Sequence, residues 1–209
     1  VGGTVAGSAT VCASSNSGSL TLSGQTGSII RWESSVDGGS TWSSISNTTA
    51  TQTYSNITST TSYRAVIQSG ACPSVNSSLT TITVNAATVG GSISGGTSVC
   101  ATSNSGTLTL SGQTGNVVRW ESSVNGGSTW STITNTSTSQ SYTNLTQTTR
   151  YRAVVQSGVC AAVNSSEGII NVDSASVGGT TSGAATVCSG SNSGTLTLSG
   201  NTGSVVRWQ

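Results

Sequence analysis

The sequence predicts an all-β protein made of tandem sandwich domains, and three features of its 209 residues predict this. The chain repeats itself at a fixed step, its apolar residues alternate along short segments, and no segment repeats them at helical spacing over ten or more positions. Turn residues, mostly glycine and serine, separate the alternating segments roughly every 8–12 residues. About seven short strands per repeat favour two packed sheets over a barrel of long strands.

The repeat has a step of 88 residues. It is defined by three sets of recurring residues: Val1, Val89 and Val177; Cys12, Cys100 and Cys188; and Trp32, Trp120 and Trp208. Residues 1–88 and 89–176 are two full copies that agree at about 55 of 88 positions, and 177–209 is the N-terminal part of a third. Since half a sandwich cannot close a core, we expect this chain to be a window on a longer protein.

The first half of each repeat predicts three strands. In the first copy, residues 18–23 alternate with Leu20 and Leu22 on one face. Residues 30–36 follow, and their alternation places Ile30, Trp32, Ser34 and Val36 together on the core face. The run Asp37-Gly38-Gly39-Ser40 predicts a hairpin, because glycine accepts positive φ, and residues 41–45 form the returning strand.

The second half predicts three more strands, around Tyr54, over 62–68 and over 79–84. In 62–68, Tyr63 shares a face with Ala65 and Ile67. The segment from Ile57 to Tyr63 has the form of a tyrosine corner, in which the tyrosine hydroxyl bonds to upstream backbone.

A cysteine pair brackets the core tryptophan of each copy, as in immunoglobulin-like sandwiches. The repeated 60-residue interval predicts the disulfides Cys12–Cys72 and Cys100–Cys160, and it leaves Cys188 without a partner here. A metal site is the alternative, but no Cys-x-x-Cys spacing, histidine or carboxylate cluster supports it. Disulfides predict an oxidising, extracellular location.

Two segments of the first copy carry a family resemblance: WESSVDGGSTWSSI (32–45) and TSYRAVIQSGAC (61–72). They resemble the tandem immunoglobulin-like repeats of Bacteroidota surface proteins, such as the giant gliding-motility adhesins of flavobacteria. The resemblance implies export by the type IX secretion system, display on the cell surface and passive extension of an adhesive tip. The partners expected through other domains are secretion or surface-anchoring machinery and surface glycans.

The charge composition excludes several classes of function. Six arginines and five acids give a net charge of +1, and the chain has no histidine. This near-neutral chain predicts no nucleic-acid binding, and no apolar run approaches the roughly 20 residues that cross a bilayer. No Ser-His or paired-carboxylate arrangement exists, so we expect no enzyme, no cofactor and no metal. Any export signal would lie outside this sequence.

A few side chains remain as site candidates. Trp32, Trp120, Trp208, Tyr63 and Tyr151 are expected in the cores. Glu33 with Arg64, and Glu121 with Arg152, are expected as cross-strand ion pairs on the outer face. Trp42 and Trp130, beside the hairpins, either fold over the sheet or stack on a sugar. Asp37 is interpreted as a turn residue and not as a calcium ligand, because Asn125 replaces it.

The predicted function is a structural stalk of a large secreted surface adhesin. The alternatives are an array of weak glycan sites, and accessory domains of a secreted polysaccharide-degrading enzyme. The partners expected inside the chain are the adjacent repeats. Residues 86–91 and 174–179 are expected to join them end to end with few contacts and some freedom to tilt.

Overall fold

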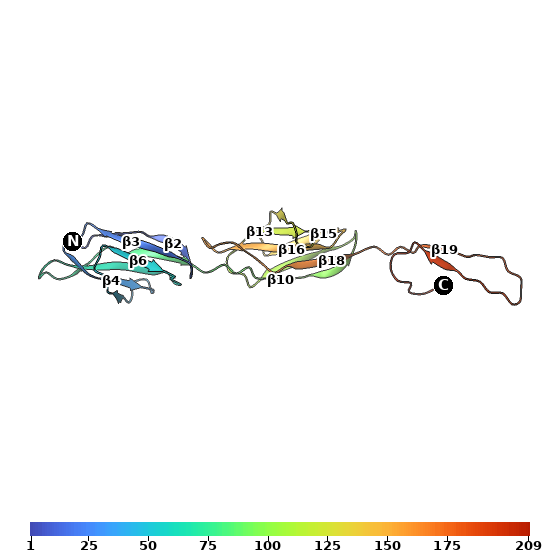
Figure 1. Cartoon of the computed structure of the whole chain (residues 1–209), viewed down its shortest axis with the longest axis horizontal. Coiled ribbons are helices and arrows are strands. Elements are labelled where there is room, and N and C mark those ends of the chain that lie inside the picture. Colours follow the sequence, from blue (N-terminus) through green and yellow to red (C-terminus); the bar gives the residue numbers. More distant parts are fainter.

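The computed structural model describes all 209 residues as two complete β-sandwiches and a terminal hairpin, arranged in a row (Figure 1). It contains strands and no helix, so the predicted all-β class with tandem immunoglobulin-like sandwiches is confirmed. The two sandwiches follow each other end to end along the long axis of the molecule (Figure 1).

Each sandwich pairs a three-stranded sheet with a six-stranded one. The small sheet of the first repeat has the order β1 (Thr4–Ala6), β3 (Ser17–Ser23), β6 (Thr51–Ser55). Its large sheet has the order β2 (Ala9–Cys12), β9 (Thr80–Asn85), β7 (Thr61–Gln68), β4 (Ser28–Ser35), β5 (Ser43–Ile45), with β8 (Val75–Asn76) beside β7. All neighbours are antiparallel except β2 and β9, which run parallel and end together.

The second repeat has the same topology. Its small sheet is β10 (Ser92–Ser94), β12 (Ser105–Ser111), β15 (Ser139–Thr143). Its large sheet is β11 (Thr97–Cys100), β18 (Gly168–Asp173), β16 (Thr149–Gln156), β13 (Asn116–Ser123), β14 (Ser131–Ile133), with β17 (Val163–Asn164) beside β16. The short strands β1, β2 and β8 and their counterparts were not predicted, because two to four residues carry too little alternation to be recognised.

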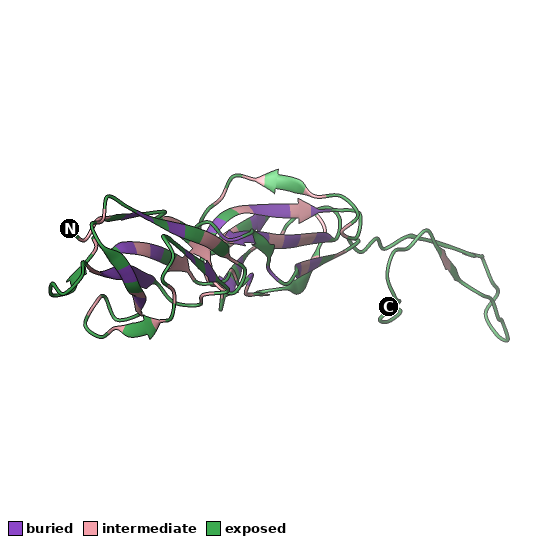
Figure 2. Ribbon diagram, turned by 60° about the vertical axis from the view of Figure 1, so that its left-hand side comes forward, coloured by how far each residue is buried: buried purple, intermediate pink, exposed green.

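The cores lie between the two sheets of each sandwich, where the buried residues of Figure 2 gather. Trp32 is fully buried, and its indole N–H donates to the carbonyl of Thr49 at 3.0 Å. Trp120 repeats this arrangement with Ser137 at 2.8 Å. Tyr63 and Tyr151, also expected in the core, are each 5% exposed. The tryptophans thus satisfy their only polar group while filling the centre of each core.

The predicted inward face of residues 30–36 is wrong at two positions. A bulge interrupts the β4–β7 register between Ile29 and Arg31 and shifts the alternation by one residue. Ile29 is therefore buried with Trp32, whereas Ile30 is 38% exposed and Val36, beyond the end of β4, is 69% exposed. The second repeat has the same bulge between Val117 and Arg119.

The tyrosine corner is also corrected. The Tyr63 hydroxyl makes no hydrogen bond, and its ring packs on Tyr54 with centroids 6.5 Å apart. Asn16 fastens this region instead: its amide donates to the carbonyls of Cys12 and Ile57 at 2.7 and 2.8 Å and accepts from the Ile57 N–H at 3.1 Å. Asn104 makes the equivalent bonds in the second repeat.

Residues 177–209 form only β19 (Thr180–Ser182) paired with β20 (Thr197–Ser199) and a bridge between Val177 and Thr202. Trp208 is 56% exposed here, so its predicted core position is wrong in this chain. The strands that cover Trp32 in the first repeat, such as β7 and β9, have no counterparts among these residues. The segment is accordingly exposed along its length (Figure 2).

Candidate functional site: the junction between the sandwiches

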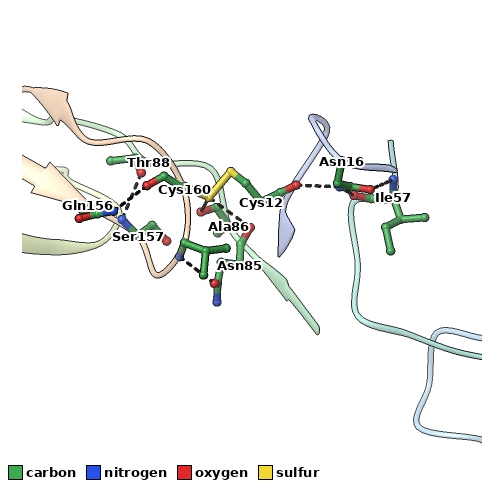
Figure 3. The surroundings of a disulfide bond; sticks show 10 residues. Cys12, Asn16, Ile57, Asn85, Ala86, Thr88, Gln156, Ser157 and Cys160 are labelled. Carbon is green, nitrogen blue, oxygen red and sulfur yellow. Dashed lines mark hydrogen bonds between the residues drawn. A yellow bond between two sulfur atoms is a disulfide. The ribbon is translucent and has the colours of Figure 1, made fainter. Parts of the chain in front are cut away.

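The junction is built where the parallel strands β2 and β9 end side by side at Cys12 and Asn85. The loop that follows β16 in the second repeat meets these strand ends, and Cys12 forms a disulfide with Cys160, 148 residues away in sequence (Figure 3). Cys160 is 2% exposed. The two sandwiches are therefore covalently joined at a second point besides the connecting chain.

This bond corrects the predicted pairing. Neither Cys12–Cys72 nor Cys100–Cys160 is formed, and Cys72, Cys100 and Cys188 are exposed free thiols. The reason is the direction of β7, which runs antiparallel to β9 and carries the chain to the opposite end of the first sandwich before Cys72. Eight strand residues at about 3.3 Å each place some 26 Å between the two ends, far beyond disulfide reach.

Hydrogen bonds fix the same loop against the first repeat. The Ser157 N–H donates to Thr88 Oγ1 at 3.1 Å (Figure 3). The Val159 N–H donates to Asn85 Oδ1 at 3.2 Å. Cys160 Sγ lies 3.3 Å from the carbonyl oxygen of Ala86. Because a disulfide sulfur carries no hydrogen, this last approach is a packing contact.

The expectation that 86–91 joins the domains with few contacts is therefore wrong. Gly90 is buried against β17, where a Cβ would strike the Asn164 carbonyl, and the Gly91 carbonyl accepts from the Ser166 N–H at 3.1 Å. These glycines are required for close approach to their own sandwich, and they do not provide a hinge.

Sequence reasoning missed Asn85, Thr88 and Ser157 as junction residues. The signal that could have identified them is their recurrence as Asp173, Ser176 and Ser69 at the repeat step. In a chain so rich in serine and threonine, that recurrence does not stand out.

A second polar cluster lies on the outer face of each large sheet. Glu33 is 6% exposed and binds Arg64 and Arg31, both at 2.8 Å. Burial raises the pKa of Glu33, but hydrogen bonds from Arg64 and Arg31 outweigh it and hold the pKa below its usual value of 4.5. Glu121 binds Arg152 and Arg119 in the same way, each at 2.7 Å, with its pKa also lowered. The cross-strand pairs predicted from register are thus present.

Trp42 covers this cluster. The Arg64 guanidinium lies over its ring at 3.9 Å, and the indole N–H donates to the Gly39 carbonyl at 3.0 Å. Trp130 and Arg152 repeat the stacking at 4.0 Å. Each ring thus presents one of its faces to an arginine of its own sheet.

Asp37 is a turn residue, as interpreted from the sequence. It accepts from the N–H of Thr41 at 2.9 Å and from the hydroxyls of Thr41 and Ser35 at 2.6 and 2.7 Å. The hydrogen bonds from Thr41, and then that from Ser35, lower the pKa of this carboxyl. Asn125 accepts from the Thr129 N–H at 2.9 Å, so a neutral side chain makes the same turn.

Two sandwiches that share one topology and are joined by a disulfide define a tandem immunoglobulin-like protein. The chain belongs to a family described as a domain of unknown function, DUF8696, which matches residues 1–86, 89–174 and 177–209. No curated protein sequence matches the chain.

Solved structures share the fold at low sequence identity. A marsupial T cell receptor is 13% identical with a TM-score of 0.50, over 84% of this chain and 75% of that one. The N-terminal four Ig domains of Dscam1 isoform 6.9 are 12% identical with a TM-score of 0.45, and this chain covers 46% of their length with 82% of its own. The fibronectin(III)-like modules of Clostridium thermocellum CbhA are 13% identical with a TM-score of 0.34, over 80% of this chain and 90% of that one. The structure contains no helix that is long and apolar enough to cross a membrane.

Proposed function

We propose that this chain is a non-enzymatic stalk segment of a secreted cell-surface adhesin, in which the repeats set reach and carry load. The observation that carries the proposal is the Cys12–Cys160 bond between consecutive sandwiches. Disulfides are stable in oxidising extracellular surroundings, so a disulfide between two domains keeps them joined there. The resemblance to Bacteroidota surface repeats supports type IX export, a surface location and, as its setting, gliding motility.

The position of the bond determines how tension would pass through the molecule. A pull applied at Val1 and Gln209 runs along the chain to Cys12, crosses the disulfide and continues from Cys160. The stretch between the two cysteines, residues 13–159, holds most of both cores and lies outside this path. While the bond is intact, tension can pull on β1 and β18, which lie in the path, but it cannot lengthen the stretch between the two cysteines.

The remaining polar groups support a spacer in preference to a binding array. Glu33 and Glu121 are each neutralised by two arginines, and Trp42 and Trp130 each hold an arginine on one face. Neither cluster presents a free carboxylate pair for acid–base chemistry.

Single-molecule pulling on the oxidised 209-residue chain tests the proposal. The full extension is expected at about 200 Å with the bond intact and about 700 Å after reduction, at about 3.5 Å per residue in the force path. Cys72→Ser is the matched control and leaves the oxidised value unchanged. Equal extensions before and after reduction, or micromolar binding of a defined sugar that Trp42→Ala abolishes, would overturn the stalk assignment.

A further inference from the structure

The exposed end of the second sandwich repeats the surface that receives the Cys160 loop at the junction. Cys100 ends β11 opposite Asp173 of the parallel strand β18, as Cys12 ends β2 opposite Asn85 of β9. Ser176 follows at the position of Thr88. At the junction Cys12, Asn85 and Thr88 are partly covered, whereas Cys100, Asp173 and Ser176 are exposed.

The inserting half of the junction is also repeated. The loop that docks in the second sandwich is Ser157-Gly158-Val159-Cys160, and the first sandwich carries Ser69-Gly70-Ala71-Cys72 at its outer end. Both Gly158 and Gly70 adopt positive φ, at 52° and 55°, so the two loops turn alike. Cys72 is exposed there, whereas Cys160 is buried. Each complete repeat therefore has an inserting loop at its N-terminal end and a receiving surface at its C-terminal end.

We propose that the C-terminal end of the second sandwich is a docking surface for the next complete repeat of the same chain, and that Cys100 forms a disulfide with the Cys160 equivalent of that repeat. The partner cysteine would lie 148 residues after Cys100, which is the separation of Cys12 and Cys160. Asp173 would accept the backbone N–H that Asn85 accepts at the existing junction, and Ser176 would replace Thr88 as the second acceptor. Every repeat is then cross-linked to the next one, and no disulfide forms within a repeat.

The bond formation needs an oxidant, and a small-molecule disulfide such as oxidised glutathione supplies it. The thiolate of Cys100 attacks the oxidant and forms a mixed disulfide, releasing one glutathione thiolate. The thiolate of the docked cysteine then attacks the Cys100 sulfur and releases the second glutathione. Two protein thiols are oxidised to one disulfide, and one glutathione disulfide is reduced to two thiols.

The test completes the third repeat, because Gln209 stands at the position of Glu121. Residues 122–176 are appended after Gln209, the extended chain is refolded with oxidised glutathione, and its disulfides are mapped by mass spectrometry without reduction. The expected bonds are Cys12–Cys160 and Cys100 with the appended copy of Cys160, while Cys72 and Cys188 stay free. A bond between Cys188 and the appended cysteine, a Cys72–Cys100 bond between molecules, or a free Cys100 would each overturn the proposal.

Three variants of the extended chain sharpen the result. Cys100→Ser is expected to leave the appended cysteine free and Cys12–Cys160 intact. Asp173→Asn keeps an oxygen acceptor and is expected to leave the rate of disulfide formation unchanged, whereas Asp173→Ala removes the acceptor and slows it several-fold. Equal rates in the two Asp173 variants would contradict the docking geometry.

The unextended chain gives a second measurement that does not depend on folding of the appended segment. Oxidised residues 1–209 should contain one disulfide, Cys12–Cys160, and three alkylatable thiols. A Cys12–Cys72 bond would remove the template on which the proposal rests. Micromolar sugar binding that Trp42→Ala abolishes would overturn the stalk function and leave Cys12–Cys160 untouched, so the stalk function can fail while the cross-linked junctions stand.

Discussion

Glu33 shows how this nearly uncharged protein uses a charge. Its carboxylate is 6% exposed and lies between two guanidinium groups, of which the Arg31 side chain is 41% exposed and the Arg64 side chain 25% exposed. A carboxylate so placed must remain ionised to keep both arginines bound. The second repeat keeps one glutamate between two arginines, with Glu121 bound by Arg119 and Arg152.

Glu33→Gln should destabilise the first sandwich by about 1–2 kcal/mol, less than for a fully buried pair because both arginines still reach water. Urea unfolding followed by tryptophan fluorescence measures the change. Asp37→Asn is the matched control: it also removes one carboxylate charge, but Asn125 makes the same turn, so its midpoint should move much less. A midpoint shift for Asp37→Asn as large as that for Glu33→Gln would contradict this assignment.

The pH dependence of stability follows from the same carboxyls. The folded-state pKa values of Glu33, Glu121 and Asp37 all lie below their ordinary values of 4.5, 4.5 and 3.8. Lowered values stabilise the folded state above the unfolded pKa, and this stabilisation is lost as pH falls through the folded pKa. Tm should therefore stay level from about pH 8 to 6 and fall below about pH 4.5. In the double variant Glu33→Gln, Glu121→Gln, Tm should fall less as the pH drops below about 4.5. A fall in the Tm of the parent protein between pH 8 and 6 would contradict this account.

At the scale of elements, hydrogen bonds from side chains to the backbone fix the positions of loops that the strand pattern does not predict. Asn16 links the end of β2 to the loop after β6 through three hydrogen bonds, directly beside the disulfide (Figure 3). It therefore sets where Cys12 is presented to the next sandwich.

Asn16→Ala should cost about 2 kcal/mol, because it leaves backbone groups of Cys12 and Ile57 without their partners. Thermal unfolding of the oxidised chain measures this loss. Asn76→Ala, at an exposed site whose side chain makes no hydrogen bond, is the control and should leave Tm within a degree or so. Equal effects of the two substitutions would show that Asn16 does not fasten the loop.

The sequence predicted the main strands well and their faces less well. Alternation identifies β3, β4, β7 and β9 because each is long enough to show the two-residue period. The bulge at Ile29–Arg31 escapes this reasoning, since one extra residue in a strand leaves no compositional mark and still reverses every face before it.

At the scale of the whole molecule, the disulfide couples two domains that would otherwise unfold separately. The double variant Cys12→Ser, Cys160→Ser should lower the free energy of unfolding by up to about 5 kcal/mol on the chain-entropy account of so long a loop. Calorimetry should also show the two sandwiches of this variant melting more independently than those of the oxidised parent protein. The double variant Cys72→Ser, Cys100→Ser is the control, and a comparable loss in that control would favour pairing within repeats.

The sequence by itself determined the repeat, the all-β class, the principal strands and the Glu33–Arg64 pair, because these depend on spacing and on neighbouring strands within one copy. Only the tertiary structure decided which cysteines pair. In this chain the cysteine positions recur every 88 residues. The spacing from Cys12 to Cys72 in the same repeat and the spacing from Cys12 to Cys160 in the next repeat are therefore equally regular. The path of β7 removes that ambiguity, since it carries Cys72 to the outer end of its sandwich and brings Cys160 to the end that faces Cys12.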